Sequence, residues 1–465
     1  MARHFRGRAR SALIRALPAA LIVFLSITAP ADGLRVGAAA VVITPPLGTP
    51  LSGYYEPRGS TGVLDDIYCK ALVIEQGGTK VAVVACDLLT LPRPTVVAAR
   101  QLIEQQTRIP GTQVMISATH QHTGPVVARE SARDQLDGGA GEAGRRYTAG
   151  LPALIARGVA EADEKLTPAR ASAALGREER LSFNRRFWMR DGSLSWNPRK
   201  QNPDIVRPAG PIDPEVGVLY FDTPQGVPLA AFVNFAMHPD TTGGTKVSAD
   251  YPGVLARLLA DYKGAGMMTL FANGACGNIN HRDVNWPDRQ SSPEEARRIG
   301  TALAGAVLRT WPRLRPVSPG ALKVRSEIVR LPLPPVTADD LARAREVVAR
   351  VGDPRTTFME KVKAFQVLDV VAQAGRPFEV EVQVITLGDQ LAWVSLPGEV
   401  FVELGLAIKQ ASPYAQTMIV ELANGSVGYI PNRAAYAEGN YEVVSARCAE
   451  GSGEMLVEAA LRLLR

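Results

Sequence analysis

Two histidines separated by one residue follow a short apolar segment of the chain, and their spacing suits a metal site. Residues 114–116 are Val-Met-Ile, which predicts a buried strand, and His120 and His122 come just beyond it, before a Gly-Pro pair breaks the chain. In extended backbone, residues i and i+2 point to the same side, so both imidazoles can face one point. Neutral imidazole is a preferred ligand of zinc and of other divalent transition metals.

Two further histidines stand at comparable places in the sequence. His238 follows the apolar residues 229–235, and His281 follows the apolar residues 268–271 after a polar turn. Ligands of α/β proteins gather at the carboxyl ends of strands, so we expect these histidines to share one site with the first pair. A histidine that only caps a strand explains any one of the four positions, but explains all four together less well.

Glu399 is the best carboxylate candidate to complete the ligand set. It follows Leu-Pro-Gly at the end of another apolar run, residues 391–395, although it could instead stabilise the N-terminus of the next helix. We expect Asp87 and Asp250, which also end elements, to support or cap loops. A catalytic metal keeps one coordination position open for water or a substrate oxygen. There it polarises a carbonyl group or lowers the pKa of the bound water to about 7. These residues therefore favour a metal-assisted hydrolase.

The polar turn at residues 273–280 offers a second kind of chemistry. Gly274 and Gly277 would let backbone N–H groups approach a reacting carbonyl, or the segment is simply a tight turn. Cys276 is the only thiol near the histidines. A nucleophilic role is open to it, but a buried structural cysteine is the favoured interpretation.

The first 31 residues have the pattern of a secretion signal. Five arginines precede an apolar segment at residues 16–28, and Ala-Pro-Ala at 29–31 fits a cleavage site. An uncleaved anchor is disfavoured because the apolar run is shorter than the ~20 residues that span a membrane. Removing this segment lowers the net charge from +6 to +1, because it holds five arginines and no acidic residue, so charge gives no support for nucleic-acid binding. We therefore expect an exported protein, periplasmic or secreted.

Strands alternate with helices after the signal, but several strands follow one another directly. That order favours one large mixed-sheet α/β domain over residues 32–465. Residues 126–142 are charged and rich in glycine, which predicts a mobile loop, and residues 428–442 predict a tyrosine-rich loop. The periodicity predicts helices at 91–106, 142–165, 251–262, 292–311, 401–410 and 451–464, and two more within 337–374.

From Gly37 to about Cys448 the chain resembles the N-terminal catalytic domain of the neutral/alkaline (non-lysosomal) ceramidases. The resemblance implies a layered α/β/β/α fold, without that family's C-terminal immunoglobulin-like domain because the chain ends soon after Tyr441. The matching motifs are Ser117–Pro125 (Ser-Ala-Thr-His-Thr-His-Ser-Gly-Pro in the family), Asn234–Pro239 (its second histidine motif), Leu396–Glu399 (its Pro-Gly-Glu) and Tyr441–Glu442 (its Tyr-Glu pair).

The resemblance also implies a site and an activity. Family members hold one zinc and hydrolyse the amide of N-acylsphingosine to a fatty acid and a sphingoid base. An arginine that lines the family's active site matches Arg185, and His122 would stand beside the metal and orient substrate or water. The implied zinc ligands are His120, His238, Glu399 and Tyr441.

One departure from the family falls at the turn after residue 271. Where the family has Gly-Asp-x-Ser-Pro-Asn with a catalytic serine, this chain has Asn278 for the aspartate and Asn280 for the serine. We therefore expect metal-bound water to attack the carbonyl, with His122 or His281 moving protons and one asparagine donating a hydrogen bond to the oxyanion.

The sequence thus predicts an exported zinc-dependent amidohydrolase similar to ceramidases. We expect it to act on N-acylsphingosine or a related N-acyl lipid, or on another small molecule, with peripheral membrane contact allowed and no nucleic-acid partner. Two alternatives stay open: an inactive metal-binding envelope protein of the same fold, and a zinc hydrolase of a different amide or ester. The sequence makes no prediction about the oligomeric state.

Overall fold

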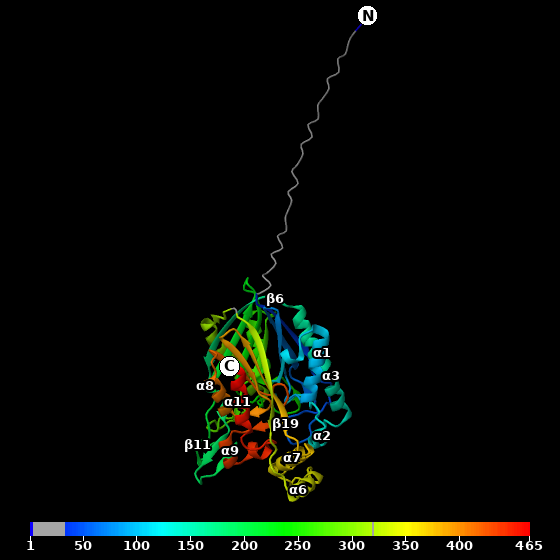
Figure 1. The fold of residues 1–465 in the computed structure, drawn as a ribbon. Helices are drawn as coiled ribbons and strands as arrows, with labels where there is room; N and C mark the ends of the chain where they lie inside the picture. Colours follow the sequence, from blue (N-terminus) through cyan, green and yellow to red (C-terminus); the bar gives the residue numbers. More distant parts are fainter. Residues whose placement is uncertain (3–32, 319) are drawn as a thin grey trace.

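The computed structural model describes residues 1–2, 33–318 and 320–465, so the predicted signal peptide falls almost wholly outside the described residues. Three mixed sheets of four or five strands form the body of the protein, with helices packed on their outer faces (Figure 1). The predicted mixed α/β class is confirmed. Among the described helices, none is both long and apolar enough to cross a membrane.

The first sheet has the order β5-β4-β3-β1-β6, and all its neighbours are antiparallel except β4 and β5. Helix α1 connects this parallel pair, and α1 and α3 lie together over the outer face of the sheet (Figure 1). The elements are β1 Arg35–Val42, β3 Tyr68–Gln76, β4 Thr79–Cys86, α1 Arg93–Thr107, β5 Val114–Ala118, α3 Glu142–Glu164 and β6 Thr167–Pro168.

The second sheet, β15-β13-β12-β7-β17, has its parallel pair at β13 and β15, which are connected by α4. Helix α5 is capped at its N-terminus, because the Ser292 hydroxyl accepts a hydrogen bond from the Glu295 N–H. The elements are β7 Arg170–Arg177, β12 Glu215–Asp222, β13 Pro228–Phe235, α4 Asp250–Lys263, β15 Met268–Asn273, α5 Pro293–Thr310 and β17 Arg315–Pro316.

The third sheet, β18-β19-β20-β22, repeats the arrangement, with α8 between the parallel strands β20 and β22. Helices α8 and α11 cover it, and the predicted helix pair α6 and α7 projects at one end of the molecule (Figure 1). The elements are β18 Leu322–Leu331, α6 Ala338–Ala349, α7 Phe358–Ala372, β19 Phe378–Leu387, β20 Leu391–Ser395, α8 Val402–Ala411, β22 Gln416–Val420 and α11 Ser452–Leu464.

One core joins the three sheets. Val83 of the first sheet, Phe232 of the second and Trp393 of the third belong to the same buried cluster. The Asn234 amide ties the second sheet to the third, because it donates to the carbonyls of Ala272 and Ile419 at 2.9 and 2.8 Å. Burial of this apolar surface holds the parallel strand pairs in fixed relation, so the loops after them can build one site.

Two predicted loops contain short helices, so those predictions were wrong in part. Residues 126–142 include α2 (Ala132–Asp137), where the Asp134 carboxylate accepts the Ser131 N–H at 3.0 Å, and residues 428–442 include β23, α9 and the start of α10. Helices of five or six residues are too short to show a periodic pattern. The remaining short elements are β2 Gly62–Val63, β8 Phe183–Asn184, β9 Arg186–Met189, β10 Leu194–Trp196, β11 Ile205–Pro208, β14 Lys246–Val247, β16 Ile279–Asn280, β21 Glu399–Val400, β23 Tyr429–Ile430, α9 Arg433–Glu438 and α10 Tyr441–Ser445.

Candidate metal centre

Three of the four strand-end histidines meet. One ring nitrogen from each of His120, His122 and His238 lies within 4.8 Å of the others. The predicted cause of this meeting, an extended backbone that points residues i and i+2 to the same side, was wrong, because His120 has φ +74° and is not extended. A left-handed backbone conformation is uncommon for residues other than glycine. At His120 it turns the chain after β5, and this turn, rather than alternation along a strand, brings His120 and His122 together.

Backbone carbonyls orient two of the imidazoles. His120 Nδ1 lies 2.9 Å from the Leu89 carbonyl oxygen, and His238 Nδ1 lies 2.9 Å from that of Cys276. A proton on each Nδ1 leaves the Nε2 lone pairs free, and both Nε2 atoms lie 3.3 Å from Oε2 of Glu399. His120 Nε2, Glu399 Oε2 and both ring nitrogens of His122 are buried without a hydrogen-bond partner among the described residues. Converging, unsatisfied imidazole and carboxylate atoms fit a divalent metal.

The electrostatics keep His238, His122 and Glu399 in the protonation states that a metal requires, whereas for His120 burial is outweighed by Glu399, which raises the pKa of that imidazole. Burial, followed by the charge of Arg185, lowers the pKa of His238 to about 3. Burial and the neighbouring His120 hold the pKa of His122 well below its usual value. Burial opposes ionisation of Glu399, but the histidines outweigh it and lower the pKa of this carboxyl far below its ordinary value.

Three tyrosines, Tyr55, Tyr429 and Tyr441, line the same cavity of about 50 Å³ as His120, His122 and Glu399. Tyr441, the predicted ligand, is there, with its ring centroid 5.3 Å from that of Tyr429. Tyr429 was missed from sequence, although it is the partner of Glu399 in the parallel β21–β23 bridge. Burial raises the pKa of both phenols, so either is neutral without a metal. The sequence signal for Tyr429, a two-residue strand after a glycine, was too short to detect.

Arg185 also reaches the site, as the resemblance implies. Its Nη1 lies 3.4 Å from His238 Nε2, and its Nε donates to Glu442 at 2.8 Å. Glu442 is fully buried and also accepts from Arg186 at 3.0 Å. Burial favours loss of the Arg185 proton, but Tyr429 and Glu442 outweigh it and raise its pKa, so the guanidinium stays charged.

The polar turn after β15 does not present its side chains to the cavity. Asn278 donates to Glu403 and accepts from the Val402 N–H, both at 2.9 Å. Asn280 donates to Asn197 at 2.9 Å and accepts from the Arg282 N–H at 3.0 Å. Both amides therefore hold loops together in this structure.

His281 also lies apart from the three other histidines. Its Nε2 is 2.5 Å from the Gln290 carbonyl oxygen, and it is absent from the converging nitrogen set. The expectation that all four strand-end histidines share one site was therefore wrong for His281.

Cys276 is structural, as favoured. Its thiol donates to the fully buried Glu421 at 2.8 Å, and its N–H donates to the same carboxyl at 3.0 Å. Burial raises the pKa of Cys276 well above its usual value, and burial raises that of Glu421 to about 8. The thiol is therefore protonated, and the pair holds the Cys276 carbonyl against His238.

The fold matches known structures. Neutral ceramidase from Pseudomonas aeruginosa superposes with a TM-score of 0.72 at 20% identity, over 93% of this chain and 74% of that one. A ceramidase complexed with C2 matches with a TM-score of 0.72 at 19% identity, over 93% and 75%. No protein-family model matches the chain, and no curated protein sequence matches it significantly. The chain therefore has the neutral ceramidase fold, as the motifs predict.

Proposed function

We propose, on the premise of this ceramidase fold, that the protein is a zinc-dependent hydrolase that cleaves the amide bond of an N-acyl lipid. The observation that carries the proposal is the meeting of His120 Nε2 and His238 Nε2 with Glu399 Oε2, at 3.3 Å each. Two imidazoles and one carboxylate are the donor set of many catalytic zinc sites. Tyr429 or Tyr441, which line the same cavity, would supply a further ligand.

A metal held by these residues would polarise an amide carbonyl and lower the pKa of a bound water. The protein's own groups supply the proton transfers. His122 is neutral and has no hydrogen-bond partner among the described residues, so it can accept a proton from the attacking water and return one to the amine that leaves. Arg185, fixed by Glu442, places a permanent positive charge beside His238, where it favours negative charge on the substrate oxygen.

Water is the nucleophile in this proposal. Cys276 is protonated and bonded to Glu421, and Asn280, at the position of the family's serine, has no nucleophilic group. The two asparagines contribute by fixing the loops around the site rather than by donating to an oxyanion. This assignment makes His122 the proton carrier of the proposed mechanism.

We also propose that residues 1–31 direct export and are then removed, which leaves a catalytic domain from residue 32 onward. The basic and apolar pattern of this segment supports the proposal. N-terminal sequencing of the protein purified from the cell envelope or medium should begin near Asp32. A protein that stays in the cytoplasm with Met1 intact would contradict it.

The function is tested by elemental analysis together with hydrolysis of an N-acyl panel that includes N-dodecanoylsphingosine. Wild-type protein and the control His281→Gln should each contain about one zinc, since one ligand cluster is present among the described residues. His120→Ala and His238→Ala should lose zinc and amide hydrolysis while remaining folded. Wild-type protein that binds zinc but cleaves no member of the panel would instead favour a metal-binding protein without catalysis.

A further inference from the structure

Three arginines line the same cavity as the metal-binding residues. Arg129 precedes α2, Arg133 lies within it, and Arg447 follows α10. Among the described residues that line this cavity, the only acidic side chain is Glu399, which the proposed function assigns to the metal. The wall therefore carries more positive charge than the site chemistry needs.

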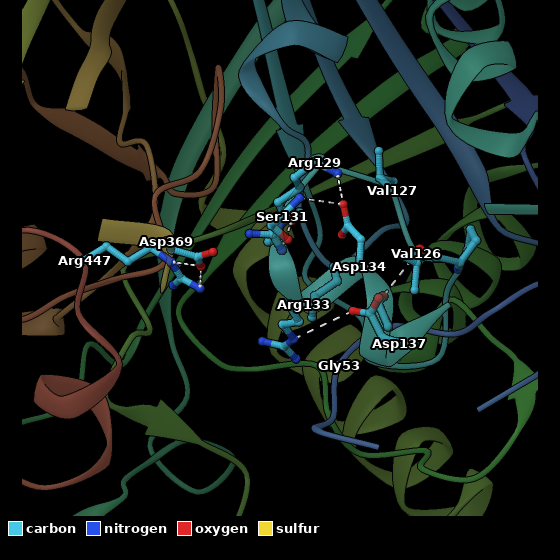
Figure 2. A pocket seen from close by; sticks show the side chains of 14 residues that line it. Gly53, Val126, Val127, Arg129, Ser131, Arg133, Asp134, Asp137, Asp369 and Arg447 are labelled. Carbon is cyan, nitrogen blue, oxygen red and sulfur yellow. Dashed lines mark hydrogen bonds and ion pairs between the residues drawn. The ribbon is translucent and has the colours of Figure 1, made fainter. Parts of the chain in front are cut away.

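Two of these arginines pair with carboxylates that do not line the metal cavity. Arg447 pairs with Asp369 at 2.6 Å, and Arg133 lies 3.7 Å from Asp137 (Figure 2). Both aspartates line a separate cavity of about 20 Å³ and not the one that contains the histidines. The arginines thus sit between their own carboxylates on one side and the metal site on the other.

Arg129 has no such partner. Its guanidinium donates to the Thr90 hydroxyl at 3.2 Å, and no carboxylate of the described residues lies within ion-pairing distance of it. The nearby Asp134 carboxylate is occupied by the backbone N–H groups of Arg129 and Ser131, at 2.7 and 3.0 Å. Local desolvation and the charges of Arg447 and Arg133 lower the pKa of the guanidinium, the charges of Asp369 and Asp134 oppose that shift, and the residue keeps contact with solvent.

The arginines also stand where the metal cavity meets a larger groove. Arg129, Ser426 and Arg447 line both spaces. The groove has a volume of about 720 Å³, within the usual range for small-molecule sites. Its wall holds apolar side chains, among them Leu368, Val371, Phe378, Val380 and Val427, and also the charged side chains of Arg93, Glu130, Asp369 and Glu379. Such a groove suits an acyl chain, with cations at the end nearest the metal.

We propose, on the premise that the proposed function holds, that the substrate is an N-acyl compound with an anionic group beside the scissile amide, which binds Arg129 and Arg447. An N-acyl amino acid has this form. Guanidinium groups bind carboxylates and phosphates through paired charge-assisted hydrogen bonds, and Arg129 forms no ion pair of its own with a carboxylate of the described residues. Hydrolysis breaks the amide C–N bond; the water oxygen enters the fatty carboxylate, and its proton passes to the amine of the released amino acid.

The test compares N-acyl compounds that differ in one group. N-dodecanoylglycine and N-dodecanoylethanolamine have the same acyl chain, but the first carries a carboxylate where the second carries a hydroxymethyl group. N-dodecanoylphosphoethanolamine carries a phosphate instead. Wild-type protein should hydrolyse at least one anionic compound with kcat/KM about tenfold or more above the ethanolamide, the effect of one charge-assisted hydrogen bond. Which anion is preferred identifies carboxylate or phosphate as the recognised group.

Arg129→Gln should abolish this preference, and Arg129→Lys should restore part of it. Arg146→Gln is the matched control, because Arg146 is 78% exposed on α3 and pairs only with Glu142 on the surface. An equal or higher rate with the ethanolamide, or a preference that survives Arg129→Gln, would overturn the inference and leave the proposed function standing.

A binding measurement separates the two proposals. If no amide is hydrolysed, the proposed function fails, and calorimetric titration of the same three compounds then tests anion recognition by itself. Tighter binding of an anionic compound to wild-type protein than to Arg129→Gln supports the inference. Equal binding to the two proteins overturns it.

Discussion

The two sides of the cavity are built in different ways. On the metal side, His120, His238 and Glu399 follow the parallel strands of three separate sheets, and backbone carbonyls fix both imidazoles. On the arginine side, Arg129 and Arg133 come from a segment around a helix of six residues, held by ion pairs and one aspartate cap. The sheet core thus makes the metal side rigid, while the arginine side depends on local polar contacts that can change without altering the fold.

The largest effect is expected from His122→Ala on the metal side. Loss of the proposed proton carrier should lower kcat by about 10²- to 10⁴-fold, the usual contribution of a general acid–base group. Zinc content should stay near that of wild type, because His120, His238 and Glu399 remain. Steady-state kinetics with parallel elemental analysis tests this. Full activity in the variant would remove His122 from the mechanism.

Glu442→Gln should have the largest effect on stability. The fully buried Glu442 pairs with Arg185 and Arg186, so the substitution leaves the buried Arg185 without its carboxylate partner and Arg186 with Glu438 alone. We expect a loss of about 3–5 kcal/mol in the free energy of unfolding. Urea unfolding measures it, with Glu438→Gln as the control: Glu438 is partly exposed, and its pair with Arg186 should be worth about 1 kcal/mol or less. Equal losses of unfolding free energy in the two variants would show that the burial of Glu442 does not determine the cost of its removal.

Glu381 of the third sheet pairs with Arg93 and Arg100 of α1 and should make stability depend on pH. Burial raises the pKa of its carboxyl, but Arg100 and Arg93 outweigh burial and lower it below the unfolded value. The pair therefore stabilises the fold above the unfolded pKa, and the stabilisation is lost as pH falls through the folded pKa. Glu381→Gln should cost about 1–3 kcal/mol at neutral pH and progressively less in acid. A constant difference from pH 7 to pH 3 would contradict the assignment.

The smallest effect is expected from Asp134→Ala, which should change only the arginine side of the cavity. It frees the N–H groups of Arg129 and Ser131, so we expect a loss of about 1–2 kcal/mol, as for a helix cap. The KM for an anionic amide should rise while zinc content and kcat stay near wild type. A change in zinc content would show that the two sides of the cavity are coupled.

Much of the fold could be predicted because its signals are local. The helices predicted at 142–165 and 292–311 begin and end within about two residues of α3 and α5, since amphipathic periodicity and capping residues lie within each segment. The division of the strands into three sheets was not predicted, because strand order depends on pairing between distant segments. The helices α2 and α10 were missed, since five or six residues carry no periodic signal.

The sequence by itself placed His120, His238 and Glu399 at strand ends and, through its motifs, predicted the ceramidase fold. Only the tertiary structure decided which groups meet: His281 bonds Gln290, Asn278 and Asn280 face other loops, and Tyr429 stands beside Glu399. It also brought Arg129 and Arg447 from distant parts of the chain to one wall. The reason is physical: a strand and its end are set by neighbouring residues, whereas the direction of a loop side chain is set by packing and hydrogen bonds with segments far away in sequence.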